Sequence, residues 1–475
     1  MTQPIARPAP ASPGSGPVPM PPPTAPPAQP SAPPPPRRSA WTEGVRRARA
    51  AAMTEPGRLR LIGAVLALLI VLFGAVTAGQ FADRTSAADA VAEHSQPLSA
   101  DAARIYRSLA DADTAASSGF LAGGDESRSV RLRYEKDIRD ASGLLASAAA
   151  NSKGSASAQR QIKKLNRGLP VYTGLVESAR ADNRQGLPLG GAYLRYANEQ
   201  MRDGLLPAAE ALYTAQTARL GEDYADAKEW PWFALAAGVL ALGALGWAQR
   251  RNYHRTNRVF NLGLLGATAA CAAALLWLTG AHAMARSALG DSDRQGAQSL
   301  RVLNEAWIGS LKARGDENMT LVARGGGSAY EKSYRKQMSG VAGRGEGADR
   351  VGGGLLGDAL ELADDPAGRR PVQEAETAVR HWQQRHEKAR AEDDDGDYDA
   401  AVETVIGADG STGESFDQVD AALGRAGTHE QAQFEQKADD GRGALGSVAV
   451  GAAVLALLGA AAAVLGLGRR LSEYR

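Results

Sequence analysis

Four long apolar blocks, none of which contains a charged residue, constrain this chain more than any other feature of its sequence. Each block has the roughly 20 residues that a helix needs to cross about 30 Å of hydrocarbon, so we predict four transmembrane helices. Ion and proton pathways need ionisable groups at membrane depth, and the blocks contain none, which argues against a channel or transporter. The blocks are residues 61–79, 231–248, 259–280 and 444–468.

Small residues recur in these blocks at four-residue spacing. The pairs are Gly63 and Ala67, Gly74 and Ala78, Gly263 and Ala267, and Gly266 and Ala270. Such pairs permit close packing of helices in lipid. The alternative is that an Ala-rich sequence scatters small residues without a structural purpose.

Clusters of arginine flank the blocks and predict their orientation. They lie before the first block (46–60), between the second and third (250–258) and after the fourth (469–470). The positive-inside rule places such segments in the cytoplasm. We therefore expect a multi-pass plasma-membrane protein in contact with membrane lipids, with cytoplasmic termini and two long extracytoplasmic segments.

The predicted spans divide the chain into a tail, two long outer segments and short connections. Residues 1–36 hold 16 of the 24 prolines, a composition that cannot bury a core and predicts a disordered tail. This tail either docks a cytosolic partner or serves as a passive spacer. The expected organisation is tail 1–57, span 58–80, outer segment 81–229, span 230–248, basic loop 249–258, span 259–280, outer segment 281–442, span 443–468 and tail 469–475.

The two outer segments are predicted to be helical and to follow one plan. In the clearest match, Tyr172, Glu177 and Arg180 recur at identical spacing as Trp382, Glu387 and Arg390, and residues 134–136 resemble 330–332. We predict an all-α fold in which an internal duplication gives two up-down four-helix bundles in tandem. Breaks are expected at 119–124, 151–155, 186–191, 325–327, 340–354 and 393–396, with a further interruption at 407–413.

Motifs for catalysis or metal binding are missing from the sequence. There is no GxSxG, HExxH, Walker A or CxxC pattern, and the single cysteine, Cys271, lies in an apolar block. We therefore predict a protein that is not an enzyme and that has no metal and no cofactor. A net charge of +1 gives no reason to expect nucleic-acid binding.

The candidate contact residues lie beside the turns that an up-down bundle brings together at its membrane-distal tip. We predict that Arg180, Asn183, Arg184 and Arg390 contact a partner or ligand, since arginine binds carboxylates in bidentate fashion. The alternative is that an arginine near a helix C-terminus interacts favourably with the helix dipole. Pro207, in the last helix of the first bundle, is the predicted site of a kink that transmits signals.

The layout of Pro-rich start, two span–bundle–span modules and short basic end resembles actinobacterial GlnX-type membrane proteins. A segment that contributes to the resemblance is Asn183-Arg184-Gln185-Gly186-Leu187-Pro188. The resemblance implies a signal relay in which a GlnH-type lipoprotein binds aspartate or glutamate outside the cell. The soluble serine/threonine kinase PknG would then adjust nitrogen and central carbon metabolism.

Two other functions stay open at the level of sequence. The chain is either a receptor that binds a small ligand directly in its bundles, at a bundle or homodimer interface, or an envelope scaffold without signalling. A partner-binding relay predicts exposed tip residues, a ligand receptor predicts a pocket with convergent arginines, and a scaffold predicts neither.

Overall fold

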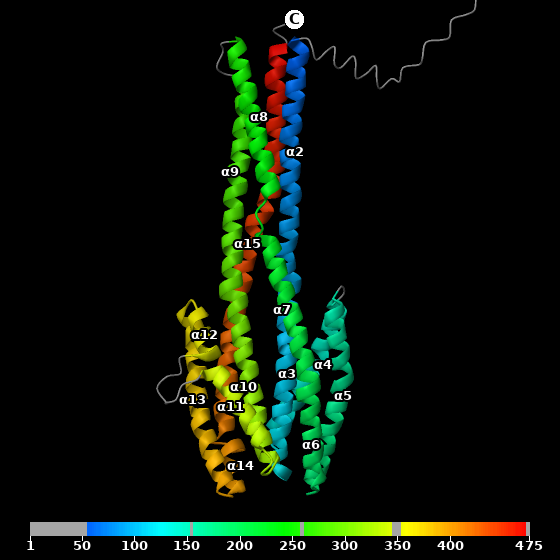
Figure 1. Cartoon of the computed structure of the whole chain (residues 1–475), viewed down its shortest axis with the longest axis vertical. Helices are drawn as coiled ribbons and strands as arrows, with labels where there is room; N and C mark the ends of the chain where they lie inside the picture. Colours follow the sequence, from blue (N-terminus) through cyan, green and yellow to red (C-terminus); the bar gives the residue numbers. More distant parts are fainter. Residues whose placement is uncertain (1–54, 153–154, 257–260, 344–352, 472–475) are drawn as a thin grey trace, which may run out of the picture. The chain divides into compact units, whose positions relative to one another are not determined.

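The computed structural model describes residues 55–152, 155–256, 261–343 and 353–471. The predicted disordered tail therefore lies almost wholly outside the described residues. Residues 59–475 form one compact unit, which contains nearly all of the residues discussed below. Across the described ranges it is built of helices and contains no strand, which confirms the all-α prediction (Figure 1).

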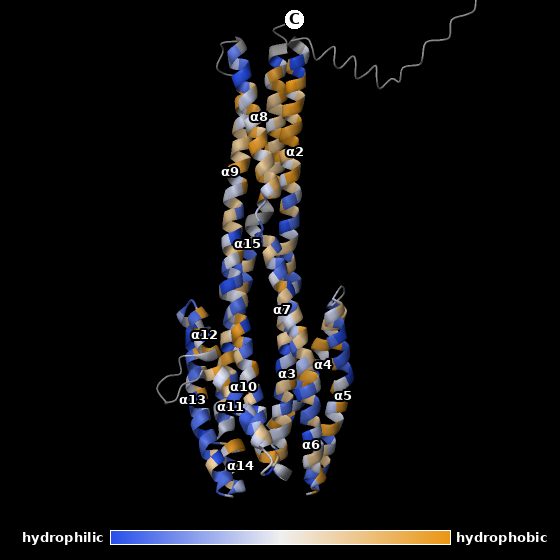
Figure 2. Ribbon diagram, viewed as in Figure 1, coloured by the Kyte–Doolittle hydropathy of each residue, from blue (hydrophilic) through white to orange (hydrophobic). Residues whose placement is uncertain are grey.

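Four helices carry the predicted transmembrane blocks. They are α2 (Glu55–Ala90), α8 (Trp232–Thr256), α9 (Leu262–Asp291) and α15 (Thr412–Leu471). Each contains a stretch that is long and apolar enough to cross a bilayer, so the four predicted spans are confirmed. Figure 2 shows hydrophobic residues concentrated where these helices lie side by side.

Glycine allows the span of α15 to pack closely against two other spans. A Cβ added at Gly263 of α9 would lie only 2.3 Å from the Cα of Gly466, so the two backbones are almost in contact. At the same place the Asn261 side-chain amide donates a hydrogen bond of 3.0 Å to the Gly466 carbonyl oxygen. A Cβ at Gly74 of α2 would lie 2.4 Å from the Cβ of Ala456. Small residues therefore determine this packing, as expected for helices in lipid.

The first outer segment is a four-helix bundle whose breaks fall at the predicted positions. Ser127 and Ser155 cap the second and third helices by accepting hydrogen bonds from backbone N–H groups. The core contains the fully buried side chains of Tyr106, Leu165 and Tyr172. The helices are α3 (Gln96–Leu121), α4 (Arg128–Asn151), α5 (Ala156–Arg184) and a fourth made of α6 (Leu189–Glu199), the π-helix η3 (Gln200–Leu205) and α7 (Leu206–Lys228).

The second outer segment is also a four-helix bundle, but its second and fourth helices are interrupted. Its core is built around the fully buried ring of Trp382. Most of the predicted break at 340–354 lies outside the described residues, but α11 ends at Ala342 and α12 begins at Gly354. The predicted break at 407–413 overlaps the gap between α14 and α15. The helices are α10 (Gln298–Val322), α11 (Ser328–Ala342) with α12 (Gly354–Leu362), α13 (Pro366–Asp394), and α14 (Tyr398–Ile406) followed by α15.

The predicted duplication is visible in the third helices. Both α5 and α13 are 29 residues long. Tyr172 and Trp382 occupy the same position in them and are both fully buried. One predicted match needs correction, because the position of Tyr134 in α4 corresponds to Tyr334 in α11 and not to Tyr330. Tyr134 and Tyr334 are each the seventh residue of their helix and buried, whereas Tyr330 lies one turn earlier and is only half-buried.

The first helix of each bundle continues directly from a span. A π-helix joins α2 to α3 (η1, Val91–Ser95), and another joins α9 to α10 (η4, Ser292–Ala297). Among the helices that the structure describes, the fourth helix of the second bundle continues without a break into a span, as α15. In the first bundle α7 ends at Lys228 and α8 begins at Trp232, because Pro231 cannot donate the backbone hydrogen bond that a continuous helix needs.

Candidate functional site

Arg180, which was predicted to contact a partner, lies inside the first bundle. Its side chain is 5% exposed, and its guanidinium pairs with Glu126 at 3.1 Å and with Glu177 at 2.8 Å. The guanidinium carbon also lies 4.2 Å from the centroid of the Tyr134 ring. Arg180 thus connects α5 to the turn before α4. It is not accessible for docking in this conformation, and its contact with a partner stays a prediction.

Asn183 and Arg184, the other two candidate residues at the membrane-distal tip of the first bundle, are more accessible than Arg180. The Asn183 side-chain amide donates a hydrogen bond of 2.8 Å to the carbonyl oxygen of Phe120, which brings the first and third turns together as an up-down bundle requires. Arg184 is exposed, and so are Leu187 and Leu189. We call Arg184, Leu187 and Leu189 the tip surface. It combines one cation with two apolar side chains.

The matching arginine of the second bundle, Arg390, lies among acidic residues. Its guanidinium pairs with Asp393 at 2.5 Å and with Asp394 at 2.6 Å, and it lies 3.8 Å from Glu331. It lines a hollow of about 780 Å³ beside Arg324. The structure therefore keeps Arg180 and Arg390 in separate bundles, each neutralised by its own carboxylates.

Pro207, the predicted transmission residue, lies at the start of α7. The π-helix η3 ends two residues earlier, at Leu205. A π-helix widens the backbone and often accompanies a kink, so this segment departs from regular α-helical geometry at the predicted place. Whether Pro207 takes part in signalling stays a prediction.

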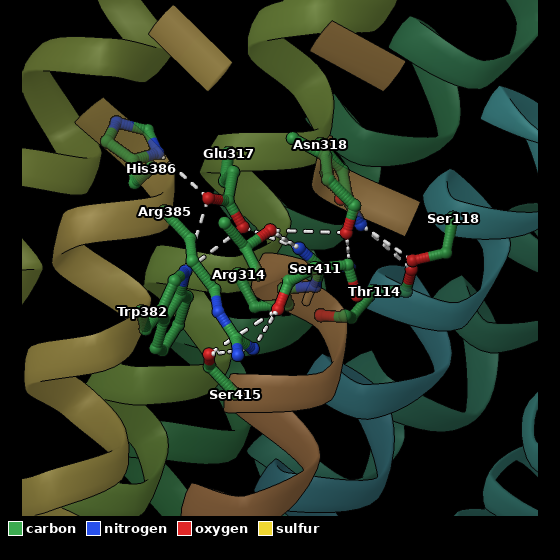
Figure 3. A network of polar contacts seen from close by, with 12 residues as sticks. Thr114, Ser118, Arg314, Glu317, Asn318, Trp382, Arg385, His386, Ser411 and Ser415 are labelled. Atoms are coloured by element: carbon green, nitrogen blue, oxygen red, sulfur yellow. Dashed lines mark hydrogen bonds and ion pairs between the residues drawn. The ribbon is translucent and has the colours of Figure 1, made fainter. Parts of the chain in front are cut away.

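A buried network of charged and polar side chains occupies the second bundle (Figure 3). At its centre Glu317 pairs with Arg314 at 2.5 Å and lies 2.8 Å from Nδ1 of His386. The Trp382 indole N–H also donates to Glu317, at 3.1 Å. Arg314 in turn donates to the Thr412 hydroxyl at 2.8 Å, close to the beginning of α15. The network therefore joins α10, α13 and α15.

Electrostatics keep this network ionised. Burial alone would lower the pKa of His386, but hydrogen bonds to Glu317 and Glu331 raise it to about 9. Burial alone would raise the pKa of Glu331, yet its contacts with His386 and Arg335 lower it to about 2. His386 is therefore a cation at neutral pH, held between two carboxylates.

The network also reaches the first bundle. Nδ2 of Asn318, in α10, donates hydrogen bonds to the hydroxyl oxygens of Ser117 and Ser118 at 3.0 and 2.8 Å, and it lies 3.3 Å from the carbonyl oxygen of Thr114. The four residues are buried or nearly so. Polar groups removed from water require such partners, so the contact between α3 and α10 has a defined register.

Two arginines of the first bundle bind carboxylates of the second. Arg133, in α4, donates to Asp111 of its own bundle at 2.8 Å and to Asp417 and Asp420 of α15 at 2.8 and 3.4 Å. Arg202, in η3, donates to Asp316 of α10 at 2.9 Å. We define this set of contacts, together with those of Asn318, as the inter-bundle contact and take it as the candidate functional site.

Burial raises the pKa of two aspartates, Asp316 in the inter-bundle contact and Asp113 inside the first bundle. Burial raises the pKa of Asp316 to about 6, although Arg202 favours its charged form. Burial likewise raises the pKa of Asp113 to about 6, and the side-chain amide of Asn198 holds its carboxylate at 2.7 Å. Within the described residues no group of three or more His, Cys, Asp or Glu side chains is placed to hold a metal ion.

Sequence reasoning identified none of the residues of the inter-bundle contact. The sequence signal is weak: the segment 312–318 is rich in charged and polar residues, which is equally typical of an exposed helix face. The partners of these residues lie about 70 to 200 positions away in the chain. No local pattern in one sequence indicates such partners.

Comparison with known proteins gives one match. Residues 87–225 match the family model described as an actinobacterial sensor domain. The matched segment contains nearly all of the first bundle, including Arg133 and Arg202. No curated protein and no solved structure matches the chain. The residues that the structure describes are thus all-helical, with four candidate membrane spans and a first bundle that matches a sensor-domain model, which indicates a sensor or receptor role.

Proposed function

We propose that this protein is a non-enzymatic receptor that relays an extracytoplasmic signal across the membrane through the inter-bundle contact. The observation that carries the proposal is the position of Arg133. It belongs to the sensor domain, yet it binds Asp417 and Asp420 on α15, the helix that continues without a break into the fourth span. A change in the sensor domain would therefore act directly on a helix that enters the membrane.

The relay needs two arrangements of the bundles with different affinities for the signal. A ligand or partner shifts such an equilibrium only as far as it prefers one arrangement, and a shift from 1:99 to 99:1 needs about 10⁴-fold preference. The inter-bundle contact is suited to this role because it consists of a few ion pairs and hydrogen bonds. Such contacts have defined partners in one arrangement and can be exchanged in another.

For the partners we propose a solute-binding lipoprotein outside the cell and a serine/threonine kinase in the cytosol. The resemblance to GlnX-type proteins suggests both, with aspartate or glutamate as the signal. The tip surface supports the outer partner, because Leu187 and Leu189 are exposed apolar side chains beside the cation of Arg184. Exposed apolar residues beside a charge are typical of protein-binding surfaces. The orientation with both bundles outside the cell rests on the arginine clusters.

The relay can be tested with an engineered disulfide between spans. A Cβ at Gly63 would lie 3.7 Å from the Cβ of Leu467, which is within the range for a disulfide. In a Cys271→Ser background, Gly63→Cys with Leu467→Cys therefore reports how α2 and α15 lie against each other. We expect Arg133→Gln to change the rate of oxidative crosslinking in native membranes at least threefold.

The matched control is Lys136→Gln, because Lys136 lies on the same helix but pairs only with Asp140 of that helix. This variant should leave the crosslinking rate unchanged. Equal rates in the Arg133→Gln and Lys136→Gln proteins would show that the inter-bundle contact is not coupled to the spans.

The outer partner is tested separately by crosslinked co-purification from membranes. Leu187→Asp together with Leu189→Asp should reduce recovery of a lipid-anchored solute-binding protein at least fivefold. Val171→Asp is the control, since Val171 is also exposed but lies along α5 away from the tip. Equal recovery from both variants would contradict docking at the tip surface.

A further inference from the structure

A cavity of about 1020 Å³ lies between the two bundles, at the halves of the bundle helices that lead toward the membrane spans. Four helices line it: the first part of α3, the second part of α7, η4 with the first part of α10, and the middle of α15. Its volume is at the upper end of the usual range for small-molecule sites. The proposed relay does not use this space.

The cavity contains one arginine without a carboxylate partner. Arg107 makes no ion pair and no hydrogen bond with any residue that the structure describes, and its guanidinium carbon lies 4.1 Å from the centroid of the Trp307 ring. Burial lowers the pKa of Arg107 to about 10, so the side chain is still a cation at neutral pH. The N–H donors of a guanidinium normally bind an oxygen anion or water.

Most of the other charged groups of the cavity are paired with a group of opposite charge. Arg104 pairs with Asp101, and Arg425 pairs with Glu374 at 2.6 Å. The acidic Asp293 pairs with Lys228 at 2.8 Å. Arg301 lies 3.9 Å from Glu305, and Glu435 accepts a hydrogen bond from the Gln431 side-chain amide. Among the arginines of this lining, Arg107 is the one that makes no ion pair with any residue that the structure describes.

The rest of the lining combines apolar and aromatic side chains with uncharged polar ones such as Gln96, Thr217 and Asn304. Tyr213, Leu220, Leu300 and Trp307 contribute to it, together with small residues of α7 and α15. A Cβ added at Gly221 or Gly427 would meet nothing within 4 Å, so the space beside these glycines is empty of protein atoms. An apolar and aromatic surface beside one arginine that has no carboxylate partner suits a molecule with one anionic group and an apolar body.

We propose that this cavity binds a small organic carboxylate, with its carboxylate on Arg107 and its apolar body against Trp307 and the neighbouring side chains. The site would give the receptor a direct chemical input between its bundles, a consequence that rests on the proposed relay. Since both bundles line the cavity, an occupant contacts both and favours the arrangement that fits it better.

The test is calorimetric titration of the full-length chain in detergent micelles with 3-phenylpropionate, compared with its uncharged analogue 3-phenylpropanamide. We expect the carboxylate to bind and the amide to bind at least tenfold more weakly. Arg107→Gln should weaken carboxylate binding at least tenfold. Arg104→Gln is the matched control and should change binding less than twofold, because Arg104 lines the same cavity but is already paired with Asp101.

A second pair of variants covers the case in which Arg107→Gln does not fold. Gly221→Leu and Gly427→Leu fill the cavity without displacing any atom near the new Cβ, and leucine favours helix more than glycine does. Both should abolish binding while leaving the melting temperature equal or higher. The proposal is overturned if the carboxylate does not bind, if it binds no better than the amide, or if the cavity-filling variants bind as well as the wild type.

The same ligand separates this proposal from the relay. If 3-phenylpropionate binds but the crosslinking rate between positions 63 and 467 does not change, the relay is contradicted and the carboxylate site is supported. If the protein does not bind 3-phenylpropionate but its crosslinking rate responds to Arg133→Gln, the relay is supported and the carboxylate site is contradicted.

Discussion

The guanidinium of Arg202 in the first bundle donates a hydrogen bond of 2.9 Å to the carboxylate of Asp316 in the second. The Asp316 side chain is 6% exposed, whereas that of Arg202 is 38% exposed. A buried carboxylate thus depends on a cation that approaches it from the neighbouring bundle. Because the two residues belong to different bundles, the coupling energy of this pair measures how strongly the bundles interact at this point.

A double-mutant cycle of Arg202→Gln and Asp316→Asn should give a coupling energy of about 1 kcal/mol at pH 7.5. The value is modest because water partly screens Arg202. Arg202→Gln alone should be more destabilising than the double variant, since it leaves a buried carboxylate without its cation. Denaturant unfolding of the full-length chain measures these energies. The exposed pair Lys136 and Asp140 is the control and should couple by less than about 0.5 kcal/mol.

A second prediction concerns pH. The pKa of His386 is about 9 in the folded protein and about 6.5 in an unfolded chain. A histidine whose pKa is higher in the folded protein than in the unfolded chain stabilises the fold when it is protonated. This stabilisation is fully present below about pH 6.5 and is lost as the pH rises through about 9. The free energy of unfolding should therefore fall by roughly 2 to 3 kcal/mol over that range.

His386→Gln should remove most of this pH dependence while lowering stability at pH 6. The measurement is the melting temperature between pH 6 and 9.5 for both proteins. His381→Gln is the control, because His381 lies on the same helix but outside the buried network. Parallel pH profiles of the wild type and His386→Gln would show that His386 is not the responsible group.

The sequence predicts features that depend on neighbouring residues and does not predict contacts between distant ones. The spans, the helix breaks and the repeat were predictable because hydropathy, glycine and the positions of large residues such as Tyr172 and Trp382 are local properties. The burial of Arg180 was not predictable, because it depends on Glu126 arriving from another helix. A residue beside a turn can be exposed or buried, and only tertiary packing decides which.

The same limit applies to His386. The sequence shows His381 and His386 five residues apart, a spacing that places them on different faces of a helix and gives no metal site. What the spacing cannot show is that one of these faces meets Glu317 and Glu331 of two other helices. The break between α7 and α8 differs from these cases, because Pro231 is a helix-ending signal that the sequence shows directly.

A third prediction compares two glycines of the same span. A Cβ at Gly263 would lie 2.3 Å from the Cα of Gly466, whereas a Cβ at Gly266 would lie 3.7 Å from the Cβ of Ala462. Gly263→Ala must therefore push α9 away from α15 and should cost about 1 to 3 kcal/mol, while Gly266→Ala should be tolerated. Thermal unfolding in detergent measures the difference. Equal melting temperatures would mean that the two backbones are not in close contact.

A fourth prediction tests the orientation. In a Cys271→Ser background, cysteines at Asn151 and Ser328 should react with a membrane-impermeant thiol reagent in intact cells, because both positions are exposed in the bundles. A cysteine at His254, beside the basic loop, should react only after lysis. Asn318, a natural choice from sequence alone, is unsuitable because it is fully buried. Labelling of position 254 from outside would overturn the cytoplasmic placement of the loop.

The last prediction concerns the route of transmission. Of the two fourth helices, only α15 runs without a break from its bundle into a span, whereas Glu229, Trp230 and Pro231 separate α7 from α8. A continuous helix transmits rotation and translation along its axis, and an interrupted one absorbs part of both. We therefore expect the signal from the inter-bundle contact to reach the membrane mainly through α15.

Proline at the exposed position Asp440 of α15 should interrupt this route, since proline in a helix interior removes a hydrogen bond and kinks the helix. In the Asp440→Pro protein, the crosslinking rate between cysteines at positions 63 and 467 should no longer respond to Arg133→Gln. Asp440→Ala controls for the lost charge and should retain the response. Pro231→Ala, which alters the junction of α7 and α8, should also retain it. If Asp440→Pro retains the response and Pro231→Ala loses it, the signal travels through the first bundle's own fourth helix and not through α15.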